Sequence, residues 1–467
     1  MSTTHYGAIV IGAGPGGYPC AIRLGQLGVK TLIVEKASWG GVCLNVGCIP
    51  SKALITAAKK FEDIRHADTF GFTVPGPVTL DMARLQNWKG GVVDKLTGGV
   101  RTLLKANGVT MLVGEATVTA AGQVTVKTAE GDQVVTADAI VLATGSRPIQ
   151  IPGFDFADGP VIDSTGALAL TEVPKRMVVI GGGYIGLEMT GVYAKLGCNV
   201  TVVEAMDQLL PGFDPDVVKV LERRLKKDGV TWMLKTKALG WERTADGIDV
   251  EVSDATGTKK LPADYVLVTV GRRPNTQNLG LEALGVTMAG PFIAVDKQCR
   301  TNVPGLFAIG DVAGNPMLAH KATHEGEIVA EVIHGRNVHS DAKVVPEVVF
   351  TDPEVAVAGL TEPKAKAKGL KIRVGKVPFA AIGRAIANHE TDGFVKVVID
   401  AETHLVLGVT VVGYHASDII SEAALAIEMA AEALDIGLTI HPHPTLGESI
   451  MEAAKHALGE AIHVVNK

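Results

Sequence analysis

Features that mark several classes of protein are scarce in these 467 residues. Aromatic residues make up only 4 %, and 44 Lys and Arg are outnumbered by 50 Asp and Glu, which gives a formal net charge of −6. Without a positive surplus, nothing favours nucleic acid or an anionic membrane surface as a partner. Apolar residues never run uninterrupted for the ~18 positions of a transmembrane helix, and residues 1–5 lack the basic segment of a secretory signal. We therefore expect a cytoplasmic protein that binds neither nucleic acid nor a membrane.

Cysteine is also scarce. Five cysteines in a chain of this length do not make the disulfide framework of a small secreted domain. In a reducing compartment, a close cysteine pair instead indicates redox chemistry or a metal site. Cys43 and Cys48 form such a pair, whereas Cys20, Cys198 and Cys299 stand alone and are interpreted as buried structural thiols.

Glycine, by contrast, is abundant, with 54 residues, and 47 % of the chain is apolar. Apolar strands joined by many tight turns are typical of α/β sheets. The length suggests about three domains of roughly 150 residues each.

An internal repeat organises much of the chain. A short apolar strand at 8–11 leads into a glycine-rich loop, a helix and a second strand that ends in an acid, and the same order returns from 177 onward. One GxGxxG loop is weak evidence, but two copies in the same context indicate two dinucleotide-binding units. The matching landmarks are all 169 residues apart, namely Gly12 and Gly181, Gly28 and Gly197, and Glu35 and Glu204.

The glycines of each loop have distinct physical roles. The first allows the tight turn out of the strand, the second lets backbone approach a pyrophosphate, and the third lets helix and strand pack closely. The unpaired N–H groups at the start of the following helix then attract the phosphates. The alternative to nucleotide binding, for either loop taken alone, is a glycine-rich turn that binds no ligand. The predicted contacts are Gly12, Gly14 and Gly17 in the first loop and Gly181, Gly183 and Gly186 in the second.

An acid ends the second strand of each unit, where it is expected to accept hydrogen bonds from a ribose. Glu35 has this place in the first unit and Glu204 in the second. A carboxylate at Glu204 would repel the 2′-phosphate of NADP, and residues 205–208 contain no Arg to offset it. The second unit is therefore predicted to bind NAD(H), whereas the first loop does not distinguish FAD from NAD.

A second pair of similar segments indicates how the two units are nested. Residues 137–148 (ADAIVLATGSRP) and 263–274 (ADYVLVTVGRRP) each resemble an apolar strand that closes one nucleotide unit. Another strand ending in an acid is expected over 301–311, so that the second unit is inserted into the first.

The composition changes near residue 344, which indicates a third domain. Strands are expected there at 347–350, 394–399 and 406–412, with an alanine-rich helical segment over 421–434. We predict an α/β fold of two Rossmann-like dinucleotide-binding units with a C-terminal α+β domain. The predicted boundaries are 1–150 for the first part of the first unit, 151–275 for the second unit, 276–345 for the rest of the first unit, and 346–467 for the C-terminal domain.

The spacing of Cys43 and Cys48 bears on whether they can bond. On a regular helix their Cα atoms would lie roughly 8.7 Å apart, whereas a disulfide needs about 4.4–6.8 Å. A bond therefore requires a departure from ideal helix, which Gly47 makes easier, and a distorted small ring is more easily reduced. Two buried thiols, a metal site and a static disulfide are the alternatives. The place of the pair between a nucleotide loop and Lys52 favours redox chemistry.

Three segments carry a resemblance to a known family. They are GGVCLNVGCIPSK at 40–52, TNVPGLFAIGD at 301–311 and HPHPTLGE at 441–448. Along nearly its whole length the chain resembles the flavoprotein disulfide reductases, and within them the dihydrolipoamide dehydrogenases. The glutathione-reducing relatives carry basic residues after the second dinucleotide strand. Those residues are missing here, in agreement with the argument from Glu204.

The resemblance implies FAD in the first unit and NAD in the second. Cys43 would exchange with the substrate, and Cys48 would be the thiolate facing the flavin. The resemblance also implies a homodimer, with the C-terminal α+β region as its dimerisation domain. His443 of the partner subunit would serve as base, and Glu448 would orient its imidazole, whose free pKa is ~6.5. The other implied contacts are Lys52, Gly145, Asp311 and Ala319 with FAD, and Glu188 and Gly271 with NAD.

For Tyr184 and His441, a purely structural role must be weighed against a functional one. Tyr184 could cover the flavin when NAD is absent, but packing at a helix start is the alternative. His441 is interpreted as a structural turn histidine.

The implied reaction is the oxidation of protein-bound dihydrolipoamide with NAD⁺. The substrate would be carried by a lipoyl-bearing acyltransferase or carrier protein of the 2-oxoacid dehydrogenase complexes or of glycine cleavage, since no lipoyl domain is visible in the sequence. One alternative is another NAD(P)H-dependent disulfide reductase, acting on glutathione disulfide or mercuric ion. Another is a flavoprotein kept as a structural or binding subunit.

Overall fold

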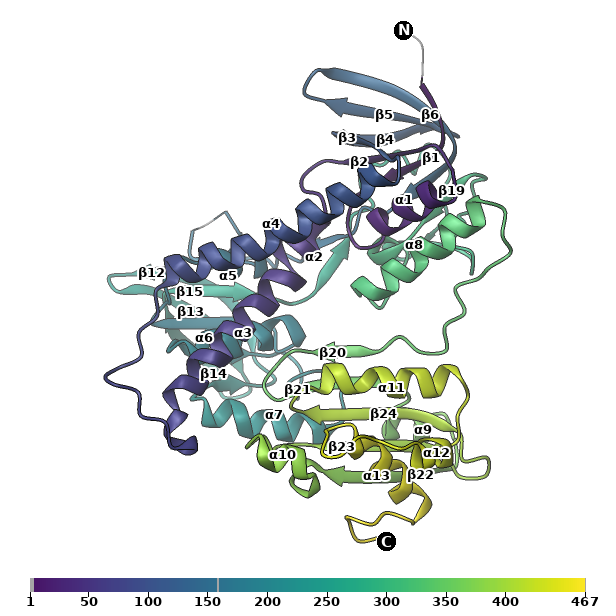
Figure 1. The fold of residues 1–467 in the computed structure, drawn as a ribbon. Helices are drawn as coiled ribbons and strands as arrows, with labels where there is room; N and C mark the ends of the chain where they lie inside the picture. Colours follow the sequence, from purple (N-terminus) through teal and green to yellow (C-terminus); the bar gives the residue numbers. More distant parts are fainter. Residues whose placement is uncertain (1–3, 158, 467) are drawn as a thin grey trace.

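The computed structural model describes residues 4–157 and 159–466 (Figure 1). The first nucleotide unit is built on a seven-stranded sheet in the order β3-β2-β1-β6-β5-β4, with β19 paired to β6. Its parallel strands are buried at the centre of the sheet, as expected for a sheet covered by helices on its faces, whereas the edge strand β3 is partly exposed. These strands are β1 (Thr4–Ile11), β2 (Thr31–Glu35), β3 (Thr110–Val113), β6 (Gly131–Leu142) and β19 (Leu306–Ala308).

Helices cover this sheet because each turns an apolar face toward it. Cys20 and Leu24 of α1 (Gly17–Gln26) are fully buried and share a core with Val329 of α8 (Ala319–Ile333). Long helix α4 (Met82–Ala106) packs along the same side. The antiparallel strands β4 (Glu115–Ala120) and β5 (Gln123–Thr128) extend the sheet beyond β6.

The second unit repeats the parallel core of the first. Its five strands run in the order β11-β10-β9-β15-β8, and every pairing is parallel. They are β8 (Val161–Ile162), β9 (Arg176–Ile180), β10 (Asn199–Val203), β11 (Thr231–Met233) and β15 (Tyr265–Val268), with helices α5 (Ser164–Ala169), α6 (Tyr184–Lys195) and α7 (Pro215–Lys227). An antiparallel sheet of β12 (Lys237–Thr244), β13 (Gly247–Asp254) and β14 (Gly257–Ala263) joins this unit.

Strand β19 joins the first sheet although it follows the whole second unit in sequence. The two crossings between the units lie side by side, because β7 (Ser146–Pro148) pairs with β16 (Arg272–Pro274). This is the nested arrangement expected from the repeated segments, and the residue boundaries of the four segments remain the division we propose. The expected strand over 301–311 is shorter than predicted. Only three of its residues are strand, and Asp311 lies beyond them in the 3₁₀ turn Gly310–Val312.

The C-terminal region is an antiparallel sheet with helices on it, seen at the bottom of Figure 1. The strand order is β20-β21-β24-β23-β22, and the central strands are buried throughout. The bounds are β20 (Glu347–Val349), β21 (Glu354–Gly359), β22 (Ile372–Pro378), β23 (Phe394–Asp400), β24 (Val406–Gly413), α9 (Glu362–Ala367), α10 (Gly383–Ala387), α11 (Ala416–Glu428), α12 (Ala433–Leu438) and α13 (Glu448–Leu458).

The helical segment expected over 421–434 is interrupted in the structure. Helix α11 ends at Glu428, and α12 begins only at Ala433. Between them Ala430 has a positive φ of 52°, and the carbonyl of Ala431 accepts a hydrogen bond from Val406 of β24. The alanine content predicted helices in this segment but not where the first one ends, because it does not reveal this tertiary hydrogen bond to the neighbouring strand.

Two consecutive helices lead from the first unit toward the second. They are α2 (Gly41–Val46) and α3 (Cys48–Arg65). By length and composition alone the stretch Gly41–Arg65 could cross a membrane, but core helices of soluble proteins meet the same criterion. Here Leu54 and Ala58 are buried in a core shared with the second unit.

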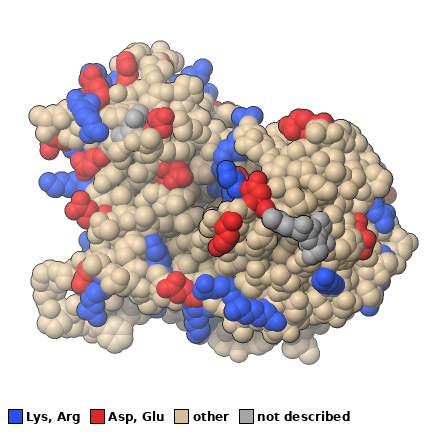
Figure 2. All heavy atoms as spheres, turned by 90° about the horizontal axis from the view of Figure 1, so that it is seen from above, with Lys and Arg blue, Asp and Glu red and all other residues tan. Residues whose placement is uncertain are grey.

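On the face shown in Figure 2, Lys and Arg are interspersed with Asp and Glu, without a continuous area of one sign.

Ion pairs at the far end of α3 fix the three parts against one another. Lys195 of α6 is only 4 % exposed and contacts Glu62 of α3 and Asp352, which follows β20, the latter at 2.7 Å. Arg224 of α7 also bonds Glu62, at 2.6 Å. Burial alone would raise the pKa values of Glu62 and Asp352, but these cations lower them.

Candidate active site

The cysteine pair lies where the chain breaks between two helices. Helix α2 ends at Val46, Gly47 has φ −140° and ψ −115°, and α3 begins at Cys48. A Cβ on Gly47 would lie 3.0 Å from the carbonyl oxygen of Val42 and 3.3 Å from the Cα of Cys43. The departure from regular helix that the spacing required is therefore present, and the absence of a side chain at Gly47 permits it.

Sequence reasoning missed the residue that holds this short helix in place. The side-chain amide of Asn45 donates to the carbonyl of Gly41 at 2.8 Å and to that of Trp39 at 3.0 Å. An Asn between two cysteines, followed by a glycine, was the available signal, because Asn side chains readily bond nearby backbone.

Both sulfurs are free thiols in the structure, and they interact with each other. A hydrogen bond from Cys43 is the main cause that lowers the pKa of Cys48 to about 7. Burial opposes this shift, and the ammonium of Lys52, one helical turn further along α3, adds to it. The same hydrogen bond, together with burial, raises the pKa of Cys43. Among the described residues, no group of three or more His, Cys, Asp and Glu could hold a metal ion.

Lys52 and Glu188 were predicted to lie near two different cofactors, yet they form a direct ion pair. Lys52 Nζ lies 2.9 Å from Glu188 Oε2, and the Glu188 side chain is only 6 % exposed. The pair joins α3 of the first unit to α6 of the second. Helix α6 also brings Tyr184, which is 40 % exposed, into the surroundings of Cys48.

The first glycine loop fits the roles that its sequence indicates. Gly12 has a positive φ of 102°, and a Cβ there would collide with the carbonyl of Ala143. A Cβ on Gly17 would collide with the carbonyl of Gly12, so the helix packs closely on the strand end. A Cβ on Gly41 would come within 2.6 Å of the Cα of Gly14, which brings the loop against the start of α2.

The second loop repeats this construction. Gly181 has a positive φ of 106°, and a Cβ there would lie 2.7 Å from the carbonyl oxygen of Thr269. A Cβ on Gly186 would collide with the carbonyl of Gly181, whereas nothing lies within 4 Å of the Cβ position of Gly183. Neither α1 nor α6 has a side-chain cap or an acid in its first turn. The first N–H groups of both helices are thus left without a side-chain partner, which suits a bound pyrophosphate.

The acids at the strand ends bind their own loops, which the sequence did not reveal. Glu35 Oε2 accepts the N–H of Ala13 at 2.7 Å, and Glu204 Oε2 accepts that of Gly182 at 2.6 Å. Their Oε1 atoms accept the N–H groups two residues further along, each at 2.8 Å. Because a carboxylate oxygen has two lone pairs, both acids keep acceptor capacity for ribose hydroxyls.

Three of the remaining predicted cofactor residues lie at or next to the crossings between the units, and the fourth, Ala319, lies on α8. Gly145 and Gly271 have positive φ angles of 68° and 127° and accept hydrogen bonds across the β7–β16 ladder, from Asn275 N and Ile149 N. Asp311 accepts a hydrogen bond from Ser146, whose hydroxyl accepts one from Arg272 Nε at 2.8 Å. Ala319 is the first residue of α8.

The predicted histidine–carboxylate pair is formed in the C-terminal region. His443 Nδ1 lies 2.9 Å from Glu448 Oε1, and Glu448 Oε2 accepts the backbone N–H of Thr445 at 2.8 Å. Burial alone would raise the pKa of Glu448, but these two hydrogen bonds lower it. The His443 side chain is 79 % exposed. No described hydrogen bond or ion pair joins it to Cys43 or Cys48 of the same chain.

Two further histidines near this motif also contact carboxylates. His441 is only 6 % exposed and bonds Glu422 at 2.8 Å, in agreement with a structural role. His463 Nδ1 lies 2.8 Å from Glu452 Oε1, one helical turn beyond Glu448 on α13. Sequence reasoning missed this second pair.

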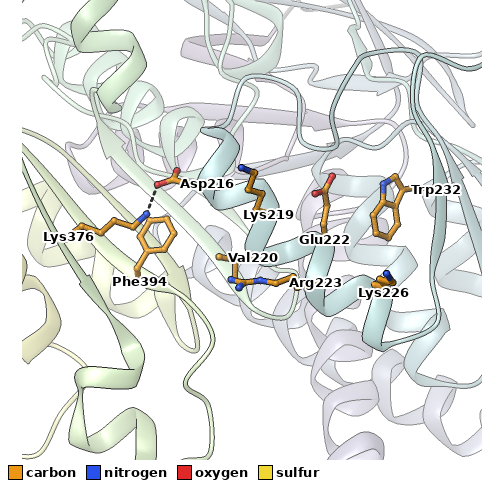
Figure 3. A pocket seen from close by; sticks show the side chains of 9 residues that line it. All are labelled: Asp216, Lys219, Val220, Glu222, Arg223, Lys226, Trp232, Lys376 and Phe394. Atoms are coloured by element: carbon orange, nitrogen blue, oxygen red, sulfur yellow. Dashed lines mark hydrogen bonds and ion pairs between the residues drawn. The ribbon is translucent and has the colours of Figure 1, made fainter.

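A hollow of about 510 Å³ lies between α7 and the C-terminal sheet. In Figure 3, Lys376 reaches toward Asp216 across it, with the ring of Phe394 beside the ammonium group. None of the residues singled out from the sequence lines this hollow.

Comparison with known proteins places this site in a family. Residues 6–326 match the pyridine nucleotide-disulphide oxidoreductase family, and residues 345–454 match the dimerisation domain of these enzymes. The chain is 50 % identical over 460 residues to the dihydrolipoyl dehydrogenase of Geobacillus stearothermophilus, which covers 98 % of this chain and 97 % of that protein. It is 47 % identical to the dihydrolipoyl dehydrogenase of Halobacterium salinarum over 463 residues, covering 98 % and 97 % of the two chains.

Solved structures show the same architecture. LpdA of Mycobacterium tuberculosis is 27 % identical and superposes with a TM-score of 0.90, covering 97 % of this chain and 99 % of that one. The HOCl-induced flavoprotein disulfide reductase RclA of Escherichia coli, solved as a Cu(II) complex, gives a TM-score of 0.87 at 27 % identity, with the same coverage of both chains. Two glycine loops, a cysteine pair at a helix break and a dimerisation domain thus occur together, and the chain belongs to the pyridine nucleotide-disulphide oxidoreductase family.

Proposed function

We infer that the protein is a dihydrolipoyl dehydrogenase, which oxidises dihydrolipoyl groups with NAD⁺ by way of a cysteine pair and FAD. The observation that carries this function is the 50 % identity to a dihydrolipoyl dehydrogenase over 98 % of the chain. The site agrees with it, because the acidity of Cys48 makes it a good leaving group in thiol–disulfide exchange.

The cofactors assigned to this family, FAD and NAD(H), fit the two loops. When bound, FAD accepts an electron pair from the protein dithiol and passes it to NAD⁺. We propose that the uncapped start of α1 holds the FAD pyrophosphate and that the uncapped start of α6 holds that of NAD(H). Glu35 and Glu204 would each receive a ribose while bracing the loop.

In thiol–disulfide exchange the two cysteines have different roles, because Cys43 is attacked by the substrate and Cys48 is the leaving group. In the oxidised protein, a substrate thiolate attacks the sulfur of Cys43, the Cys43–Cys48 bond breaks, and Cys48 leaves as a thiolate. The second substrate thiol then loses its proton and attacks the sulfur bound to Cys43, which releases the cyclic substrate disulfide and the Cys43 thiol. The substrate has lost two electrons, and the protein pair has gained them.

A base must accept the substrate protons, and His443 has the required surroundings. Its Nδ1 is engaged by Glu448, which leaves Nε2 for the substrate. Because His443 is exposed and makes no described contact with the cysteines of its own chain, we propose that it serves the pair of a partner subunit in a homodimer. Leu438 and Ile440, just before this motif, are 72 % and 95 % exposed, as expected for residues that a second copy covers.

The physiological partner would be a cytoplasmic protein that carries the lipoyl group. We propose a lipoyl-bearing acyltransferase or carrier protein of a 2-oxoacid dehydrogenase complex or of glycine cleavage. A pull-down with lipoylated and unlipoylated carrier proteins tests this, and equal recovery of both forms would contradict it.

Side-by-side assays test the reaction itself. NADH-linked reduction of lipoamide, glutathione disulfide and mercuric ion is measured with the same holoenzyme, and lipoamide is expected to be the preferred substrate. A His443→Gln variant should lose lipoamide turnover by about 10²–10⁴-fold but should still be reduced by NADH. Negligible lipoamide activity in the unaltered enzyme would refute the proposed function.

A further inference from the structure

The residue that follows β20 contacts both members of the Lys52–Glu188 pair. The backbone N–H of Phe350 donates to Glu188 Oε1 at 3.0 Å. The face of the Phe350 ring lies under the ammonium of Lys52, with 4.2 Å between Nζ and the ring centroid. Phe350 belongs to the segment that matches the dimerisation domain, so all three parts of the chain meet at Lys52.

These contacts leave Lys52 little freedom. Its ammonium is held by Glu188 Oε2 on one side and by an aromatic face on another, and its side chain is only 33 % exposed. The N–H of Phe350 occupies the other carboxylate oxygen of Glu188, which keeps Oε2 directed at Lys52. Lys52 follows Cys48 by four positions on α3, so its side chain stands on the same helix face.

We propose that Phe350 is a positioning residue that holds the Lys52 ammonium beside Cys48 and so sets how readily this thiol ionises. The proposal rests on the proposed function only in that Cys48 belongs to the redox pair. It assigns the dimerisation domain a role toward the cysteines of its own chain, through β20, in addition to any contact with the partner subunit.

The charges around Cys48 explain why a small displacement matters. The groups that act electrostatically on or with Cys48 are Cys43 from α2, Lys52 from α3, and Glu188 and Tyr184 from α6. After the hydrogen bond from Cys43 and the opposing effect of burial, the Lys52 cation lowers the pKa of Cys48, whereas the Glu188 carboxylate raises it. The two charges partly cancel. Loss of the ring frees the ammonium to move toward water, which leaves the carboxylate less well balanced.

The rate of alkylation of Cys48 measures its ionisation directly, because only the thiolate displaces iodide from iodoacetamide. The holoenzyme carrying Cys43→Ser provides a single reactive thiol. The other three cysteines are buried, and burial raises their pKa values, to about 12 for Cys198 and Cys299. Mass spectrometry assigns the label to Cys48, and the rate is followed from pH 5 to 10.

Removal of the Phe350 ring should raise the pH at which Cys48 alkylation reaches half of its maximal rate. In the Cys43→Ser background, Phe350→Leu is expected to raise the midpoint by about half a pH unit, or about 0.7 kcal/mol, which is the size of a cation–π contact. Phe350→Met, a second ringless variant, should do the same if the Leu variant folds poorly. Phe350→Tyr keeps an aromatic face and should retain the parent midpoint.

The chain supplies a matched control. Lys376 Nζ lies 3.7 Å from the ring centroid of Phe394, a pair of the same kind at the hollow between α7 and the C-terminal sheet (Figure 3). Phe394→Leu should leave the Cys48 profile unchanged. Parent midpoints in both ringless variants, or an equal shift in Phe394→Leu, would overturn the proposal. Lipoamide turnover of the unaltered enzyme is measured separately, so failure of the proposed function would be recognised as such.

Discussion

Glu204 braces the second glycine loop by accepting the N–H of Gly182 at 2.6 Å. Because the acceptor is charged, this bond contributes about 1.5–3 kcal/mol. Glu204→Ala is therefore expected to weaken NADH binding by roughly 10–100-fold, as measured by titration of NADH against the holoenzyme. FAD retention should not change.

The first unit provides the reciprocal control. Glu35 holds Ala13 in the same way, so Glu35→Ala should reduce FAD retention and spare NADH affinity in the protein that keeps its FAD. If both substitutions weakened the same cofactor, the assignment of one cofactor to each loop would be wrong.

A second prediction concerns pH and Glu448. Its pKa is lowered in the folded protein, so its carboxylate contributes stability above the unfolded value of ~4.3, and this contribution is lost as the pH falls through the folded pKa. Glu448→Gln should lower the melting temperature at pH 7, and the difference from the unaltered protein should shrink as the pH falls below about 4.3 and vanish below the folded pKa of Glu448. Glu402→Gln, which removes an exposed carboxylate that is 72 % accessible, controls for loss of one charge. A constant difference at all pH values would argue against the linkage.

A third prediction concerns the break at Gly47. In Gly47→Ala the added Cβ would press on Val42 and Cys43, so the cysteines should be displaced and exchange should slow. Reductive titration should then show uptake falling from about four electrons toward two, the capacity of flavin alone. Gly90→Ala, on α4 with nothing within 4 Å of its Cβ position, should retain full uptake. Full uptake with unchanged lipoamide turnover in Gly47→Ala would show that the break is dispensable.

A fourth prediction concerns the exposed apolar residues before His443. Ile440→Asp places a charge on a side chain that is 95 % exposed in the single chain, and it should dissociate the proposed dimer because a charge is costly in an apolar interface. Sedimentation velocity gives the mass, and lipoamide turnover should fall together with the dimer fraction. Leu239→Asp, on the distant strand β12, makes the same change on a side chain that is 50 % exposed and should remain dimeric. A monomeric Ile440→Asp with full turnover would place His443 in the site of its own chain.

The sequence predicted those features that depend on local pattern. Glycine spacing and short apolar strands set the turns at Gly12 and Gly181, because only glycine adopts these positive φ angles without a clash. The nesting of the units followed from the repeat. Local pattern did not predict the break at Ala430, since a hydrogen bond from β24 overrides helix propensity there.

Individual side-chain contacts between distant residues could not be predicted. Lys52 and Glu188 are separated by 136 positions, and the sequence placed them at different cofactors. The acids Glu35 and Glu204 were recognised, but their bonds to the loops depend on the path of the loop backbone. Phe350 lies in a segment that was expected to be a strand, and nothing in the surrounding sequence indicated its contact with Lys52.

The matching bonds of Glu35 and Glu204 also bear on the origin of the chain. Two loops 169 residues apart share not only glycine spacing but also the same pair of backbone donors to the acid. Duplication of one unit would leave such a shared detail behind, and the carboxylate brace is common to both loops although they are proposed to hold different nucleotides.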